Sequence, residues 1–147
     1  MAKQIHPSKR ERFRGRKNGH SFLMLPHFVI QSPQWRALSG NAIKFLVELA
    51  SAYDGSNNGD LSLTRKQALA KGWRSGETRD SAADEAIAAG FALLTRQGNK
   101  GACNLYAITW QPVDDVGKGV MYASSLKASR VWESREPLPK NWAQVAR

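Results

Sequence analysis

The sequence has a single cysteine, Cys103, and three histidines among its 147 residues. One cysteine excludes an intramolecular disulfide and any metal site built from four cysteines, as is typical of proteins in a reducing compartment. The histidines His6, His20 and His27 are scattered along the N-terminal part, and none of them has metal-ligand spacing to Cys103. We therefore expect no metal site.

Long apolar runs are absent as well, because no stretch approaches the roughly 20 residues that span a bilayer. The basic N-terminus is not followed by the apolar segment of a secretory signal. The sequence contains no Walker loop, nucleophile elbow or zinc-protease motif. Asp114 and Asp115 are adjacent, so their carboxylates point apart in an extended segment and make a poor acid–base pair. These absences predict a soluble cytoplasmic protein that is not an enzyme and needs no cofactor.

Positive charge is present in excess: 22 Lys and Arg stand against 12 Asp and Glu, a formal net charge of +10. Residues 1–20 alone contain seven of these cations and one acidic residue. Their large apolar residues, Ile5 and Phe13, are too few to offset the entropy of ordering, so we expect a flexible arm. Basic arms typically follow polyanions, and four arginines are expected to contact DNA phosphates or the minor groove: Arg10, Arg12, Arg14 and Arg16. RNA recognition and a solubilising role stay open for the arm.

Two helix starts lie before the middle of the chain. Ser32 followed by Pro33 predicts a single helical turn. Ser39 is a good N-cap, and apolar residues recur after it at helical spacing until Asp54-Gly55: Ala42, Phe45, Leu46, Leu49, Ala50 and Tyr53. The loop that follows resembles the start of a calcium loop, but Arg65 stands where a bidentate Glu is required. We interpret this loop as a polar turn.

Two further helices are predicted, separated by a short turn. Thr64 opens the first, with Ala68 and Leu69 expected to face the core, and Gly72 ends it. Trp73, in the turn, is expected to pack into the core. Ser75 caps the second helix, which is predicted to end near Ala89 with a stripe of small apolar residues: Ala82, Ala83, Ala86, Ile87 and Gly90. Two short helices joined by a glycine-containing turn are typical of a helix-turn-helix.

A hairpin is predicted next, because the β-rich segments 91–96 and 103–110 flank a Gly- and Asn-rich turn. Cys103 is expected to be a small buried residue at a strand start. Together with a brief strand at Leu61–Leu63, the element order predicts an α+β fold, namely a winged helix with a three-helix core and a two-stranded hairpin wing. The predicted organisation is a basic flexible arm of residues 1–20, a winged-helix domain of residues 21–112 and a partly ordered C-terminal tail of residues 113–147.

Four separated segments between residues 22 and 112 occur in a characteristic order: Leu25–His27, Ser32–Ser39, Asp54–Gly59 and Leu61–Thr64. In these segments the chain resembles winged-helix proteins of bacterial phages, plasmids and integrated elements, which include transcriptional regulators and the DNA-binding modules of replication initiators. The resemblance implies a DNA-binding protein of a mobile element, located at the nucleoid in a bacterial cytoplasm.

The third predicted helix is the expected recognition helix. Its first residues have side chains of the types that read base edges in the major groove: Ser75, Glu77, Thr78 and Arg79. Basic residues around this helix are expected to contact phosphates, which gives affinity rather than sequence choice. These are Arg65, Lys66, Lys71 and Arg74 from the helix pair, and Arg96 and Lys100 from the wing.

We therefore expect sequence-preferring binding to double-stranded DNA, in the regulation of transcription or replication. A homodimer is a further expectation, with Trp132 and Trp142 of the tail as its contacts. Two alternatives stay open. One is a winged-helix module that binds or inhibits a protein partner in a nucleoprotein complex, and the other is the DNA-binding module of a replication initiator.

Overall fold

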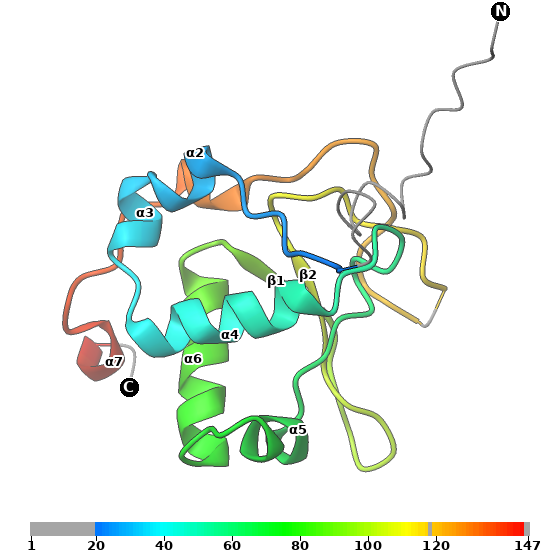
Figure 1. The fold of residues 1–147 in the computed structure, drawn as a ribbon, viewed down its shortest axis with the longest axis horizontal. Helices are drawn as coiled ribbons and strands as arrows, with labels where there is room; N and C mark the ends of the chain where they lie inside the picture. The colour runs from blue at the N-terminus through cyan, green and yellow to red at the C-terminus, as the bar shows by residue number, and fades with distance from the viewer. Residues whose placement is uncertain (1–19, 118, 146–147) are drawn as a thin grey trace, which may run out of the picture.

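The computed structural model describes residues 20–117 and 119–145, so the predicted arm lies outside the described residues, apart from His20. The fold is mixed α+β, with helices packed against a two-stranded antiparallel sheet (Figure 1). The elements in chain order are α2 (His27–Ile30), α3 (Pro33–Arg36), α4 (Gly40–Ser51), α5 (Arg65–Ala70), α6 (Gly76–Ala88), β1 (Ala92–Arg96), β2 (Leu105–Ile108), the 3-10 helix η1 (Val131–Ser134) and α7 (Trp142–Val145). In the part of the chain that the structure describes, no helix combines the length and the apolar character needed to cross a bilayer.

Helix α4 forms the centre of the core, as its sequence pattern predicts. The Ser39 hydroxyl accepts a hydrogen bond from the Ala42 N–H at 3.2 Å, which satisfies one of the free amides at the helix start. The predicted apolar face is buried, except for Tyr53, which lies beyond the helix and is half-buried. The helix ends at Ser51, shortly before the predicted Asp54-Gly55. The single turn α3 is also confirmed, with Ser32 as its cap.

Helices α5 and α6 begin at the predicted caps. Thr64 and Gln67 form a reciprocal capping box at α5, and the Ser75 hydroxyl accepts from the Thr78 N–H at α6. Trp73 is buried in the turn between them, as expected. The prediction for Leu69 is wrong, because this side chain is 53% exposed. A six-residue helix buries only a narrow stripe at Ala68, and the next residue lies about 100° further round the axis.

The predicted hairpin is present as β1 and β2, which pair antiparallel from Ala92↔Ile108 to Arg96↔Leu105. Leu61 adds a short third segment, because its N–H and C=O both bond to the backbone of Tyr106, at 3.1 and 2.8 Å. Strand β2 begins at Leu105, so Cys103 lies in the preceding loop and is exposed. The prediction that Cys103 is buried is therefore wrong.

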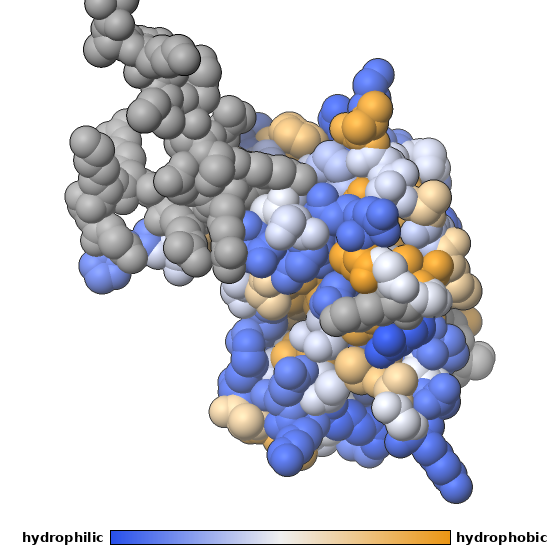
Figure 2. Space-filling view, turned by 90° about the vertical axis from the view of Figure 1, so that its right-hand side faces the viewer, coloured by the Kyte–Doolittle hydropathy of each residue, from blue (hydrophilic) through white to orange (hydrophobic). Residues whose placement is uncertain are grey.

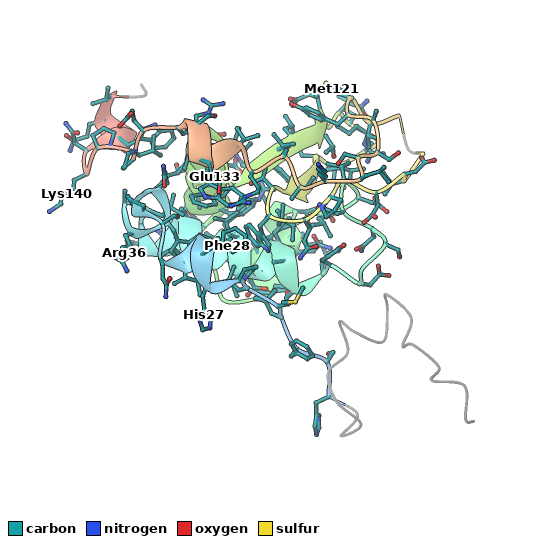
Figure 3. The ribbon with its side chains drawn as sticks, turned by 90° about the horizontal axis from the view of Figure 1, so that it is seen from above. His27, Phe28, Arg36, Met121, Glu133 and Lys140 are labelled. Carbon is teal, nitrogen blue, oxygen red and sulfur yellow. The ribbon has the colours of Figure 1, made fainter. Side chains whose placement is uncertain are left out.

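The chain after residue 112 contributes to the core. Trp132 of η1 is 1% exposed and stacks on Phe91, with ring centroids 5.2 Å apart. The Arg130 N–H donates to the Thr109 carbonyl at 2.9 Å, and Phe28 of α2 lies beside η1 (Figure 3). Because Trp132 is buried within its own chain, it does not offer the dimer contact that the sequence suggested. Trp142, on α7, stays half-buried.

The loop between α4 and α5 is a polar turn, as interpreted from the sequence, with Gly55 at φ 97° and Gly59 at φ 117°. Asn58 lies in it without exposure and was not singled out from the sequence. Its amide nitrogen donates to the carbonyls of Ile108 and Pro112 at 2.9 and 2.8 Å, and its oxygen accepts from the Ile108 N–H at 2.8 Å. The Asn58 side chain thereby makes the hydrogen bonds that a neighbouring strand would otherwise make with the backbone at the end of β2.

Candidate nucleic-acid interface

The N-terminal end of α6, the helix α5 and the hairpin turn, here residues 97–104, lie at one end of the molecule (Figure 1). A cleft of about 260 Å³ separates the helix pair from the hairpin, lined by Thr64, Arg65, Arg79, Asp80, Cys103 and Asn104. Seen from the hairpin side, the surface at this end is mostly hydrophilic (Figure 2). The predicted DNA contacts from the described residues all come from this end of the fold.

Ser75 and Thr78, two of the predicted base readers, are half-buried and bonded to each other. Their hydroxyl oxygens are 3.0 Å apart, and the Ser75 oxygen also accepts from the Thr78 N–H at 3.1 Å. These bonds hold the first turn of α6 closed. A base contact by either hydroxyl would therefore compete with the helix cap.

Arg79 is not on the exposed face of α6, so the prediction that it faces outward is wrong. Its side chain is 8% exposed. The Nε atom donates to the Leu63 carbonyl at 2.5 Å, and Nη2 donates to the Tyr106 hydroxyl at 3.1 Å. The guanidinium also lies over the rings of Phe45 and Tyr106, at 5.5 and 5.6 Å. A cation needs such partners to be buried, and here they come from three parts of the fold: α4, the Leu61–Leu63 segment and β2.

The sequence contained a signal for this burial. Arg79 precedes Ala82, Ala83 and Ala86 by three, four and seven residues, the spacing of one helix face. The apolar stripe that predicted the buried face of α6 therefore begins at Arg79. The positive charge of the side chain favoured an exposed position in the sequence interpretation, whereas hydrogen bonds and aromatic rings decide its place.

Glu77 is the predicted base reader that is fully on the surface, with a side chain 76% exposed. It lies near Arg65, at 3.6 Å, and Arg65 makes a closer ion pair with Asp80 at 2.5 Å. Burial raises the pKa of Asp80, but hydrogen bonds from Arg65 and Arg79 hold it below its ordinary value. Arg65 is thus exposed and yet neutralised by two carboxylates, which reduces its attraction for a phosphate.

The exposed side of α6 carries carboxylates rather than cations. Glu77, Ser81 and Asp84 are its exposed positions, spaced four and three residues apart. Partial desolvation of the Asp84 carboxylate raises its pKa, and the charge of Asp80 raises it further. This acidic face, which the sequence interpretation did not single out, repels phosphates.

Three of the predicted phosphate contacts are exposed cations without an ion pair to any described residue. Lys66 of α5, Arg74 of the turn and Lys100 of the hairpin turn are exposed, and no described carboxylate lies within ion-pair distance of them. Lys71 pairs with Glu48 of α4 at 2.9 Å. Arg96 is half-buried and donates to the Cys103 carbonyl at 3.0 Å, so its guanidinium lies along the hairpin. Among the described residues that were predicted to contact phosphates, Lys66, Arg74 and Lys100 are the ones whose charge is available to a phosphate.

The predicted arm residues Arg10, Arg12, Arg14 and Arg16 lie outside the described residues. Among the described residues, no group of His, Cys, Asp and Glu side chains is arranged to hold a metal ion. Comparison with protein-family models, curated proteins and solved structures returned no match.

Proposed function

We propose that the chain is a winged-helix protein that binds double-stranded DNA and regulates transcription or replication of a mobile genetic element. The observation that carries the proposal is the placement of three exposed cations, Lys66, Arg74 and Lys100, on the helix pair and the hairpin turn at one end of the fold, with no ion pair to another described residue. The order of α4, the Leu61 segment, α5, α6 and the hairpin supports the winged-helix assignment. The positive charge of residues 1–20 adds to the attraction for DNA.

In this proposal the phosphate contacts dominate and base contacts are few. Lys66 and Arg74 approach the backbone beside α6, and Lys100 approaches it from the wing. With Arg79 buried, Glu77 and Ser81 are the exposed side chains left on the first turns of α6. Carboxylate and hydroxyl oxygens accept hydrogen bonds from base amino groups such as cytosine N4. Any sequence preference is therefore expected to be modest and to favour such donors.

Selection of bound fragments from random duplex DNA, followed by footprinting, tests the proposal. We expect enrichment of a short motif and a salt-dependent affinity. Lys100→Ala should weaken binding to all duplexes equally and lower the slope of log affinity against log salt by about one unit. The matched control is Lys140→Ala, because Lys140 is exposed near α7, away from the hairpin (Figures 1 and 3). Equal affinities for wild type and Lys100→Ala would contradict the placement of the wing on DNA.

Deletion of residues 1–20 tests the arm. Affinity for any duplex should fall and its salt dependence should become shallower, because each lost phosphate contact removes about 0.9 from the slope. The preferred sequence should change little, except for some loss of A·T preference if the arginines enter the minor groove. The thermal unfolding temperature of the truncated protein provides the control for an intact fold.

A protein-binding module is the second candidate, and the acidic face of α6 favours it. Glu77 and Asp84 project from the helix that a DNA-reading protein would place in the major groove, and both carry the charge of the phosphates. Neutralising the carboxylate that has no proposed base contact separates the two candidates: Asp84→Asn should strengthen DNA binding by removing repulsion. A flat fragment selection together with unchanged DNA affinity in Asp84→Asn would favour a protein partner.

A further inference from the structure

The hairpin turn extends beyond the paired part of the sheet. The register of β1 and β2 ends at Arg96↔Leu105. In the turn that follows, the backbones of Asn99 and Ala102 pair in one isolated bridge. Lys100 lies at the tip of this segment. Its position relative to α6 therefore depends on side-chain contacts that hold the turn.

Arg96 makes one such contact at the base of the turn, to the Cys103 carbonyl, and Asn104 makes two more. Its Oδ1 atom accepts a hydrogen bond from the Gly98 N–H at 2.5 Å, and its Nδ2 atom donates to the Tyr106 hydroxyl at 3.3 Å. A Cβ on Gly98 would lie 2.8 Å from the carbonyl oxygen of Ala102 and from the backbone nitrogen of Asn104. Glycine at position 98 thus permits the close approach on which the Asn104 bond depends.

The same Tyr106 hydroxyl accepts from Arg79 Nη2 at 3.1 Å. Arg79 is in turn held by the Leu63 carbonyl and by Asp80 at 2.9 Å. Gly98, Asn104, Tyr106 and Arg79 therefore form a continuous polar relay from the hairpin turn to the first turn of α6. Every link in it is a hydrogen bond between residues that are buried or half-buried.

We propose that this polar relay fixes the hairpin turn, and with it Lys100, at a set position relative to α6, so that Arg79, Tyr106 and Asn104 are positioning residues for DNA binding. The inference rests on the proposed function. A wing that is already held in place loses less conformational entropy when it binds a phosphate, so its affinity is higher. Arg79 then contributes to DNA binding without touching DNA.

Tyr106→Phe tests the relay because it removes one oxygen and leaves the buried ring. Binding to duplex DNA should weaken about fivefold, the equivalent of one ordinary hydrogen bond. In a Lys100→Ala background the same change should alter affinity less than about twofold, because the contact that the relay positions is already absent. Asn104→Ala, at a half-buried site, should behave in the same way. Tyr122→Phe, on an exposed tyrosine elsewhere, is the matched control.

Amide hydrogen exchange provides a readout that does not involve DNA. In Tyr106→Phe the Gly98 amide should exchange about fivefold faster, whereas amides of α4 should keep their rates. Equal losses of DNA affinity with and without Lys100 would show a general loss of stability and overturn the relay, as would an unchanged Gly98 exchange rate. If Lys100→Ala itself leaves DNA binding unchanged while the Gly98 amide responds as expected, the relay holds the turn, and it is the proposed DNA function of the wing that is overturned.

Discussion

Replacing Arg79 by alanine should destabilise the fold rather than relax a base preference. The guanidinium donates hydrogen bonds to Leu63, Asp80 and Tyr106, and hydrogen bonds of charged groups contribute about 1.5–3 kcal/mol each. Removing the guanidinium also removes the cost of burying its charge, which offsets part of this loss. Removal of one partner from a buried ion pair typically costs about 3–5 kcal/mol in total. Asp80 keeps Arg65 as its partner. We therefore expect the lower end, about 3 kcal/mol.

Denaturant and thermal unfolding followed by circular dichroism measure this loss. For a chain of this length, about 3 kcal/mol corresponds to a fall in Tm of about 10 °C. Glu77→Ala, on the exposed side of the same turn, is the control and should change the free energy of unfolding by less than about 0.5 kcal/mol. An Arg79→Ala protein with the Tm of wild type but an altered base preference would show that the side chain faces DNA, and would refute the reasoning.

Three further substitutions test the core and its electrostatics. Trp132→Ala should lower the free energy of unfolding by about 3–5 kcal/mol in urea titrations, and a loss below 1 kcal/mol would contradict its place in the core. Gly90→Ala should cost about 1–3 kcal/mol by the same assay, because φ is +86° and a Cβ would lie 2.7 Å from the Trp132 nitrogen; Gly40→Ala, with open space, is its control. Asp80→Asn should lower the Tm at pH 7. Because the folded-state pKa of Asp80 is lowered, its contribution is present above the ordinary Asp pKa of about 4 and is lost as the pH falls through the folded value, so the two Tm values should converge in acid.

The sequence by itself determined the local elements of this protein. Ser39, Thr64 and Ser75 start their helices because a side-chain oxygen satisfies an amide only three residues away. The hairpin follows from two β-rich segments around a glycine-rich turn, and the buried face of α4 follows from helical spacing. Each of these features depends on neighbours within a few residues, so each can be derived without knowing what packs against it.

Only the tertiary structure decided that Asn58, Arg79 and Trp132 are buried. Asn58 bonds to the end of β2, 50 residues further along the chain, and Trp132 enters the core beside Phe91. Arg79 faces inward because Phe45, Leu63 and Tyr106 converge on it from separate elements. Burial of a polar group requires partners for its hydrogen bonds, and partners distant in sequence meet only when the chain has folded.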